Sequence, residues 1–273
     1  MTEARRALIS KNAYLLLESA RARSYPVNLK TVLNAPFLRE KRIETESAER
    51  YAAYFGKPFP VKDWDGYLFT FESDDFYIVF YNGAKRPISR VIWTILHEIA
   101  HALLAHTDKD AGESEANRFT ALVLCHPLIL SRCGISDSSS VKKLCAVSES
   151  AARITQGELQ KPFAANVWDY KIADLFDGFC ARRVCSACRL PCDVARAPFC
   201  AACGSKTFTR SVDIFLDDVF NKTPRCPVCD NEAAQSGAFC EICGVRRLNV
   251  CPECKSAVSA GFTFCVYCGA RLK

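Results

Sequence analysis

The chain has 273 residues, of which 49% are hydrophobic, and a formal net charge of +6 at pH 7. This length predicts a sizeable core and about two domains. The absence of any apolar run of about 18 residues excludes a membrane-spanning helix, and so modest a charge does not by itself indicate a nucleic-acid binder. The mixed charge of the first residues and the short run AYLLL do not fit a signal peptide, so we expect a cytoplasmic protein.

Cysteine is the outlier of the composition, with 17 residues. Cys125, Cys133 and Cys145 are scattered, whereas all the others fall between Cys180 and Cys268. In a reducing compartment this density indicates metal sites rather than disulfides. The change in composition places the main domain boundary near residue 180.

The middle of the first domain predicts a strand followed by a long helix. Residues 76–81, FYIVFY, are aromatic and β-branched, and the next two residues, Asn-Gly, are typical of a turn. From Ser89 onward, apolar residues recur at the spacing of a helix.

This helix contains the pattern H-E-x-x-H within the stretch TILHEIAHALLAH. His97 and His101 are four residues apart, so both imidazoles project from one face toward one ion, and Glu98 lies between them. The pattern is short, and two core histidines with an incidental glutamate are the alternative interpretation. His106, near the helix end, is interpreted as a solvated residue that interacts favourably with the helix dipole.

A catalytic zinc needs a third protein ligand and an open position. A longer form of the pattern requires histidine at position 107, where this chain has Thr107. After the polar turn TDKDAG, the stretch ESEANRFTALVLCHP predicts a second helix that ends before Pro127. Either Glu113 or Glu115 of this helix can complete a His-His-Glu site.

The order of strand, Asn-Gly turn, HEIAHALLAH and ESEANRF before a proline resembles the ImmA/IrrE family of metallopeptidases over about residues 10–160. The resemblance implies that His97 and His101 bind one catalytic zinc ion, that Glu98 is the general base and that Glu115 is the third ligand. The chain departs from the family pattern at Cys125 and His126, near the expected substrate groove. The fold expected from these features is α+β: a gluzincin-like peptidase domain over residues 1–136, with a small sheet and the H-E-x-x-H helix.

Residues 141–159 predict two helices joined by a turn, with Ser148 at the start of the second. They resemble the helix-turn-helix segment that follows the catalytic helices in this family, and we assign the segment to residues 137–178. Such a segment can read DNA, but a packing unit is the favoured interpretation.

The remaining sequence contains one pattern three times. Each copy has C-x-x-C, a gap of 11, 10 or 10 residues, and then Phe-C-x-x-C-Gly. Two such pairs of thiolates surround one structural Zn²⁺ at about 2.3 Å, and the glycines fit turns with positive φ. The phenylalanines are expected to pack under their own hairpins. The predicted ligands are Cys185, Cys188, Cys200 and Cys203 in residues 179–224; Cys226, Cys229, Cys240 and Cys243 in residues 225–246; and Cys251, Cys254, Cys265 and Cys268 in residues 247–273.

The first ribbon has two further cysteines nearby, and a short helix is predicted after it. Cys180 and Cys192 lie near its four predicted ligands, and we prefer the set that matches the other repeats. Residues 213–220, DIFLDDVF, are amphipathic and predict a connector helix between the first and second ribbons.

The expected function is that of a zinc-dependent endopeptidase with one catalytic and three structural zinc ions. The resemblance implies a cytoplasmic helix-turn-helix repressor of mobile-element or stress genes as substrate, and the ribbons are expected to recruit the substrate or a partner, more readily protein than nucleic acid. The alternatives are a DNA-tethered SprT-like protease and a non-catalytic ribbon adaptor or nucleic-acid binder. No membrane partner is expected. The candidates to stabilise the oxyanion are Tyr77, Tyr81, His106 and His126.

Overall fold

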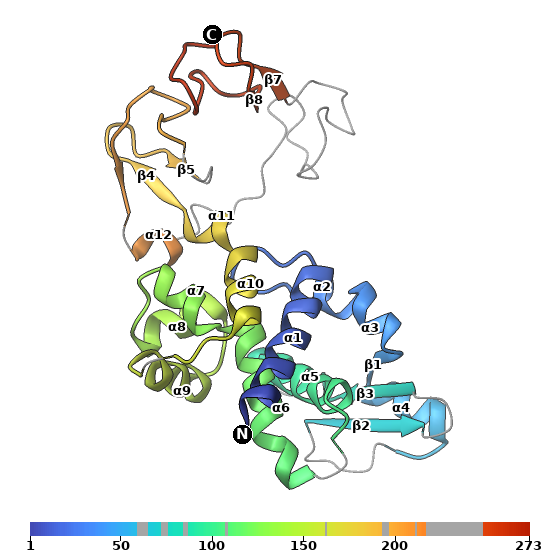
Figure 1. Ribbon diagram of the computed structural model, residues 1–273. Coiled ribbons are helices and arrows are strands. Elements are labelled where there is room, and N and C mark those ends of the chain that lie inside the picture. Colours follow the sequence, from blue (N-terminus) through green and yellow to red (C-terminus); the bar gives the residue numbers. More distant parts are fainter. Residues whose placement is uncertain are drawn as a thin grey trace. The chain divides into compact units, whose positions relative to one another are not determined.

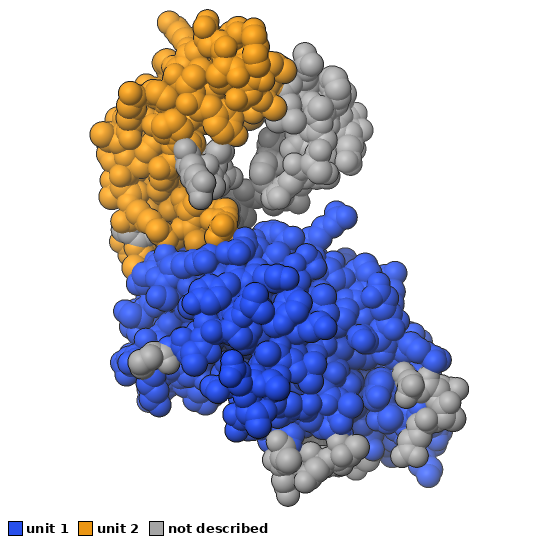
Figure 2. Space-filling model, viewed as in Figure 1, with its two compact units in different colours: residues 1–176 blue, residues 177–273 orange. Residues whose placement is uncertain are grey.

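The computed structural model (Figure 1) describes residues 1–58, 65–71, 76–83, 87–106, 109–161, 163–192, 197–210, 212–216 and 248–273. It divides into two compact units, Met1–Phe176 and Asp177–Lys273, which are coloured separately in Figure 2. The division lies close to the change in composition near residue 180. None of the described helices combines the length and the apolar character that a membrane span requires.

The first unit contains a three-stranded sheet with the order β1-β3-β2. The central strand β3 (Phe76–Tyr81) pairs parallel with β1 (Ile43–Ser47) and antiparallel with β2 (Gly66–Phe71). Residues 78–80 of β3 are buried, as expected for a strand between two others that is covered by helices. The predicted strand at residues 76–81 is confirmed.

Helices make up most of this unit, and α5 lies against all three strands of the sheet. Helix α6 packs on α5 and on α1, and α10 packs on α1. The two helices expected to carry the metal ligands are therefore neighbours. The helices are α1 (Glu3–Ser19), α2 (Leu29–Leu33), α3 (Pro36–Glu40), α4 (Ala48–Phe55), α5 (Ile88–Leu103), α6 (Lys109–Leu124), α7 (Pro127–Arg132), α8 (Ser138–Cys145), α9 (Glu149–Leu159) and α10 (Val167–Leu175).

The long helix predicted from Ser89 is confirmed as α5, whose apolar face is buried. Helix α6 begins earlier than the sequence suggested, at Lys109 instead of near Glu113. The end of the stretch TDKDAG is thus helical, and Gly112 lies inside the helix. This glycine allows a close approach of His106.

The predicted helix, turn and helix of residues 141–159 are α8 and α9. Ala146 ends α8 in the left-handed region with φ of 55°, and the Ser148 hydroxyl accepts a hydrogen bond from the Ala151 amide at the start of α9. Helices α8 to α10 belong to the first unit, and α9 and α10 both pack on α7. The segment therefore packs within the first unit.

A buried polar network centred on Asp169 joins α10 to α1 and α7. The Asp169 carboxylate accepts hydrogen bonds from the Ser10 hydroxyl and the Asn166 amide, both at 2.8 Å, and His126 Nε2 lies 3.4 Å away. Burial lowers the pKa of His126. Because this side chain is fully buried, it has no access to a substrate, which removes it from the oxyanion candidates.

The second unit is built from short elements, as expected for domains with little core of their own. Strands β4 (Arg183–Cys185), β5 (Pro191–Cys192) and β6 (Phe208–Thr209) form a sheet with the order β5-β4-β6. Strands β7 (Leu248–Val250) and β8 (Ala257–Ser259) form a second, antiparallel sheet. The short helices are α11 (Asp177–Cys180) and α12 (Asp213–Leu216), and the rest of the predicted connector after α12 lies outside the described residues.

Candidate active site and zinc ribbons

The two histidines of the H-E-x-x-H pattern project from α5 toward a common point. Their Nε2 atoms are 3.1 Å apart, and the His97 and His101 side chains are only 14% and 10% exposed. The apolar residues between them face the core, so packing of α5 fixes the direction of both rings.

Glu113 of α6 completes this cluster. Its carboxylate oxygens lie 3.1 Å from His97 Nε2 and 3.4 Å from His101 Nε2. Two ligands that are each about 2.0–2.1 Å from a tetrahedral zinc ion lie about 3.3 Å from each other. The distance between the two Nε2 atoms is close to such an edge, and each of them lies near one of the two Glu113 oxygens. The donor set of two imidazoles and one carboxylate fits a zinc ion with one open position.

The electrostatics of the cluster also fit a cation. Burial, followed by the neighbouring His97 and His106, lowers the pKa of His101 to about 4. Burial is likewise the largest cause that lowers the pKa of His97. The lowered pKa values favour neutral rings, which present the lone pair that metal coordination requires.

Glu115, which the resemblance implies as third ligand, lies in a different environment. Its Oε2 atom accepts a hydrogen bond from Arg5 Nε at 2.6 Å and lies 2.9 Å from His106 Nε2. Residues two apart on a helix point about 200° away from each other, so Glu113 and Glu115 do not face the same point. Of the two glutamates that the residue pattern left open, the geometry brings Glu113 to the histidine pair.

Glu98 is half-buried and lies close to Gly66, the first residue of β2. A Cβ atom on Gly66 would lie 2.5 Å from Thr94 Cγ2 and 3.4 Å from Glu98 Cγ. The absence of a side chain at Gly66 thus lets α5 approach β2 closely at the position of Glu98. Tyr81, one of the oxyanion candidates, lies opposite Gly66 in the strand register.

The interpretation of His106 as a solvated residue is wrong, because its side chain is only 6% exposed. Its Nδ1 atom lies 2.9 Å from His101 Nδ1 and its Nε2 atom 2.9 Å from Glu115. Sequence reasoning missed this role because His106 follows His101 by five residues, a spacing that a continuous helix would not bring together.

A cavity of about 680 Å³ adjoins the cluster and is lined by α5, α6 and α9. Its lining includes Thr94, which precedes His97 by three residues, and Asn117, which follows Glu113 by four. Trp93 and Ile154 supply apolar surface. None of the three candidate ligands lines the cavity, so a polypeptide segment bound there would approach the cluster from the side of Thr94 and Asn117.

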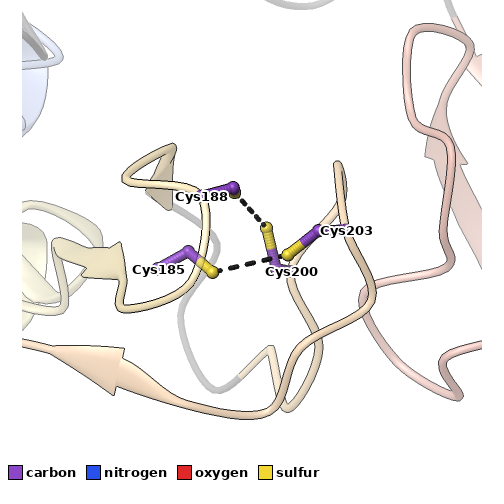
Figure 3. Close-up of side chains that lie close together, drawn as sticks. All are labelled: Cys185, Cys188, Cys200 and Cys203. Carbon is purple, nitrogen blue, oxygen red and sulfur yellow. Dashed lines mark hydrogen bonds between the residues drawn. The ribbon is translucent and has the colours of Figure 1, made fainter.

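In the first ribbon, four cysteines converge from two turns (Figure 3). The sulfur atoms of Cys185 and Cys203 are 3.6 Å apart, as are those of Cys188 and Cys200. Thiolates at about 2.3 Å from a tetrahedral zinc ion are about 3.8 Å apart, whereas disulfide sulfurs are about 2.0 Å apart. The geometry fits zinc and not disulfides. Neither Cys180 nor Cys192 belongs to this described cluster, although both are buried.

The third ribbon has the same geometry. Its sulfur–sulfur distances are 3.7 Å between Cys251 and Cys268 and 3.6 Å between Cys254 and Cys265. In both ribbons the turns direct backbone amides toward sulfur. For Cys185, burial opposes ionisation, but the amides of Cys188 and Ala187 lower the thiol pKa to about 6. These sites suit structural zinc, because four protein thiolates leave no open position.

The first and third ribbons contact each other reciprocally. The Phe199 amide donates to the Val266 carbonyl at 3.2 Å, and the Phe264 amide donates to the Ala201 carbonyl at 2.9 Å. These are equivalent positions of the repeat, so the contact has an internal two-fold character. Cys192, Ala197 and Val266 form a small shared core.

The phenylalanines pack differently from the expectation that each covers its own hairpin. The ring of Phe264 lies over Gly204 of the first ribbon, and the ring of Phe199 lies over Gly269 of the third. A Cβ atom at Gly204 or Gly269 would lie 3.0 Å or 2.5 Å from the opposing ring. Each ribbon therefore supplies an aromatic cover for the other.

Positive φ alone does not explain these glycines. In the first C-x-x-C turns, the matching positions are Arg189 and Lys255, with φ of 62° and 60°, close to the 71° and 78° of Gly204 and Gly269. The first turns adopt this backbone with a side chain present. The second turns have glycine because a phenylalanine ring approaches them.

The predicted second ribbon lies outside the described residues, so the structure gives no geometry for it. Its predicted ligands are Cys226, Cys229, Cys240 and Cys243.

Comparison with protein-family models gives two matches. Residues 57–132 match the model of a peptidase family described as the IrrE N-terminal-like domain, and residues 226–269 match the model of the double zinc ribbon. The first match contains the whole candidate cluster, and the second contains the second and third repeats. A search of curated proteins found no match. The resemblance predicted from the sequence is confirmed: the chain combines an IrrE N-terminal-like peptidase domain, as in ImmA/IrrE metallopeptidases, with zinc ribbons toward its C-terminal end.

Proposed function

We propose that the protein is a zinc-dependent endopeptidase in which His97, His101 and Glu113 hold the metal and Glu98 is the general base. The observation that carries this proposal is the convergence of three metal-ligating side chains at 3.1–3.4 Å from one another. When bound, a zinc ion at this place supplies a Lewis acid that activates water and polarises a peptide carbonyl.

The residues of the chain supply the remaining chemistry. Glu98 follows His97 directly, so its carboxylate is positioned to take a proton from the attacking water and to give it to the leaving amine. The cavity beside the cluster positions the substrate, with Trp93 and Ile154 as apolar contacts and Asn117 as a polar one. Tyr77 and Tyr81 stay our candidates on β3 for contacting the developing oxyanion, and Tyr81 lies opposite Gly66, which approaches Glu98.

The proposed substrate is a cytoplasmic helix-turn-helix repressor, which rests on the family resemblance. The ribbons are proposed to recruit this substrate or a partner, because closed four-cysteine sites do not hydrolyse peptide bonds. A three-histidine site of the SprT-like kind is not favoured. His106 contacts the Nδ1 atom of His101, whereas Glu113 lies near its Nε2 atom, so His106 is not on the side of the proposed metal position.

The proposal is tested with a library of peptides and the zinc-loaded full-length protein, with cleavage sites mapped by mass spectrometry. The wild type is expected to cleave, and Glu98→Gln is expected to lose about 10²–10⁴-fold of this rate while it retains the metal. Glu113→Ala is expected to lose both activity and the zinc of the first unit. Cleavage by Glu98→Gln at the wild-type rate would contradict the proposal. Loss of zinc in Glu115→Ala but not in Glu113→Ala would show that Glu115, and not Glu113, is the third ligand.

A further inference from the structure

We infer that His106 is a positioning residue that orients the ring of His101 through a directed chain of hydrogen bonds ending at Glu115 and Arg5. The inference rests on the proposed function in one respect, the assignment of His101 Nε2 as a metal ligand. It gives a role to three residues that the catalytic proposal does not use.

The end of α5 brings His106 back over His101. The His106 amide donates to the His101 carbonyl at 3.1 Å, and the Ala105 amide donates to the Ala102 carbonyl at 3.3 Å. Ala105 between them has φ of 51°. This is a Schellman motif, in which the residue after the left-handed position contacts the residue five before it. Here that contact is between two imidazoles, with ring centroids 4.9 Å apart.

The direction of each hydrogen bond follows from the first. If His101 Nε2 offers its lone pair to the metal, the neutral ring carries its proton on Nδ1. His101 Nδ1 then donates to His106 Nδ1 across 2.9 Å, and His106 must carry its own proton on Nε2. That proton points to Glu115 Oε2 at 2.9 Å. Every donor in this series of hydrogen bonds has an acceptor, and the Glu115 carboxylate at its end is paired with Arg5.

Arg5 of α1 closes the chain. Its Nε donates to Glu115 at 2.6 Å, and its Nη2 donates to the Leu104 carbonyl at 3.1 Å, in the turn that carries His106. The same guanidinium therefore holds both the acceptor of His106 and the backbone beside it. Ligating histidines commonly donate their second ring N–H to a partner that fixes the ring, and loss of that partner typically weakens metal binding about 10–100-fold.

The position of the His106 ring depends on the absence of a side chain at Gly112. A Cβ atom at this position would lie 2.6 Å from His106 Nδ1 and 2.7 Å from Cγ. The φ of Gly112 is not in the left-handed region, so the glycine is required by the imidazole and not by the backbone. Gly157 of α9 is a matched control, because a Cβ there meets nothing within 4 Å.

The first test reads the histidine tautomers in the zinc-loaded, full-length protein by ¹⁵N nuclear magnetic resonance. The chain has four histidines, all in the first unit, so the ribbons add no signals. We expect metal-shifted Nε2 atoms in His97 and His101, a proton on Nδ1 of His101 and a proton on Nε2 of His106. A proton on Nδ1 of His106, or a metal-shifted His106 ring, overturns the inference. Absence of any metal shift in His97 and His101 would instead contradict the proposed function.

The second test measures zinc affinity of the same site by chelator competition, with the histidine signals reporting occupancy. His106→Leu and Gly112→Ala are expected to weaken binding about 10–100-fold, while Gly157→Ala leaves it unchanged. His106→Asn, whose side-chain oxygen offers an acceptor near the position of Nδ1, should recover part of the loss. Tryptophan fluorescence of the zinc-free variants checks that the first unit is folded. Wild-type affinity in both His106→Leu and Gly112→Ala would overturn the inference.

Discussion

The two units differ in what their candidate metal sites are built on. In the first, three ligands come from α5 and α6, which are already fixed by a core that includes Ile95, Leu96 and Phe119. In the second, each of the two described four-cysteine clusters lies between short turns, and the buried residues of the third ribbon's core are Cys251, Val258 and Cys265. Two of those three residues are themselves predicted ligands. Under the proposed function, the metal of the first unit would serve catalysis on a core that is already folded, whereas the metal of the second unit would take the place of a core.

The largest expected effect comes from removing zinc, which should separate the two units. Structural zinc contributes about 10–16 kcal/mol to the folding of small zinc domains, so chelation is expected to unfold the described ribbons and leave the first unit folded. All three tryptophans lie in the first unit, so their fluorescence should keep its folded value. Thiol titration should meanwhile detect newly reactive cysteines. A loss of folded tryptophan fluorescence on chelation would contradict the distinction.

Asp169→Asn tests whether the first unit depends on its own buried network. The substitution removes a charge that accepts from Ser10, Asn166 and His126, and we expect a loss of about 2–3 kcal/mol in the free energy of unfolding. The matched control is Asp174→Asn on the same helix, where the side chain is 63% exposed and the expected change is below about 0.5 kcal/mol. Denaturant unfolding followed by tryptophan fluorescence measures both. Equal effects would show that the network is not a support of this unit.

Phe264→Ala tests whether the first and third ribbons stabilise each other. This half-buried ring covers Gly204 of the other ribbon, and its loss should cost about 1–2 kcal/mol. The zinc of the first ribbon should then be released more readily, although the substitution lies in the third. Tyr267→Ala, at an exposed position three residues later, is the control. Zinc release confined to the third ribbon would show that the two sites are independent.

A smaller effect is expected from acid, and it should be specific to the first unit. Burial lowers the pKa of His126 in the folded state, so the unfolded chain takes up this proton first, near pH 6.5. The free energy of unfolding is therefore expected to fall as the pH drops below about 6.5, by up to about 1.4 kcal/mol per pH unit for one such group. His126→Asn retains an acceptor for the Leu128 amide but does not titrate, and its profile should be flatter. An unchanged profile would assign the dependence to other groups.

The sequence by itself determined the features that depend on local spacing. The interval of four between His97 and His101 places two rings on one helical face, and the paired C-x-x-C turns indicate which cysteines share an ion, because each ligand pair lies within one turn. The central strand and the helices α5, α8 and α9 follow from periodicity and capping in the same way.

Only the tertiary structure decided which distant residues meet. The choice of Glu113 over Glu115 at the histidine pair depends on the rotation of α6 about its axis, which packing against α1 and α5 sets. The burial of His106 depends on a helix end that turns back and on an arginine about a hundred positions earlier. The repeats are equivalent in sequence, so they do not specify their own pairing; contacts between Phe199 and Gly269 and between Phe264 and Gly204 join the first ribbon to the third, because long-range packing and not spacing selects a partner.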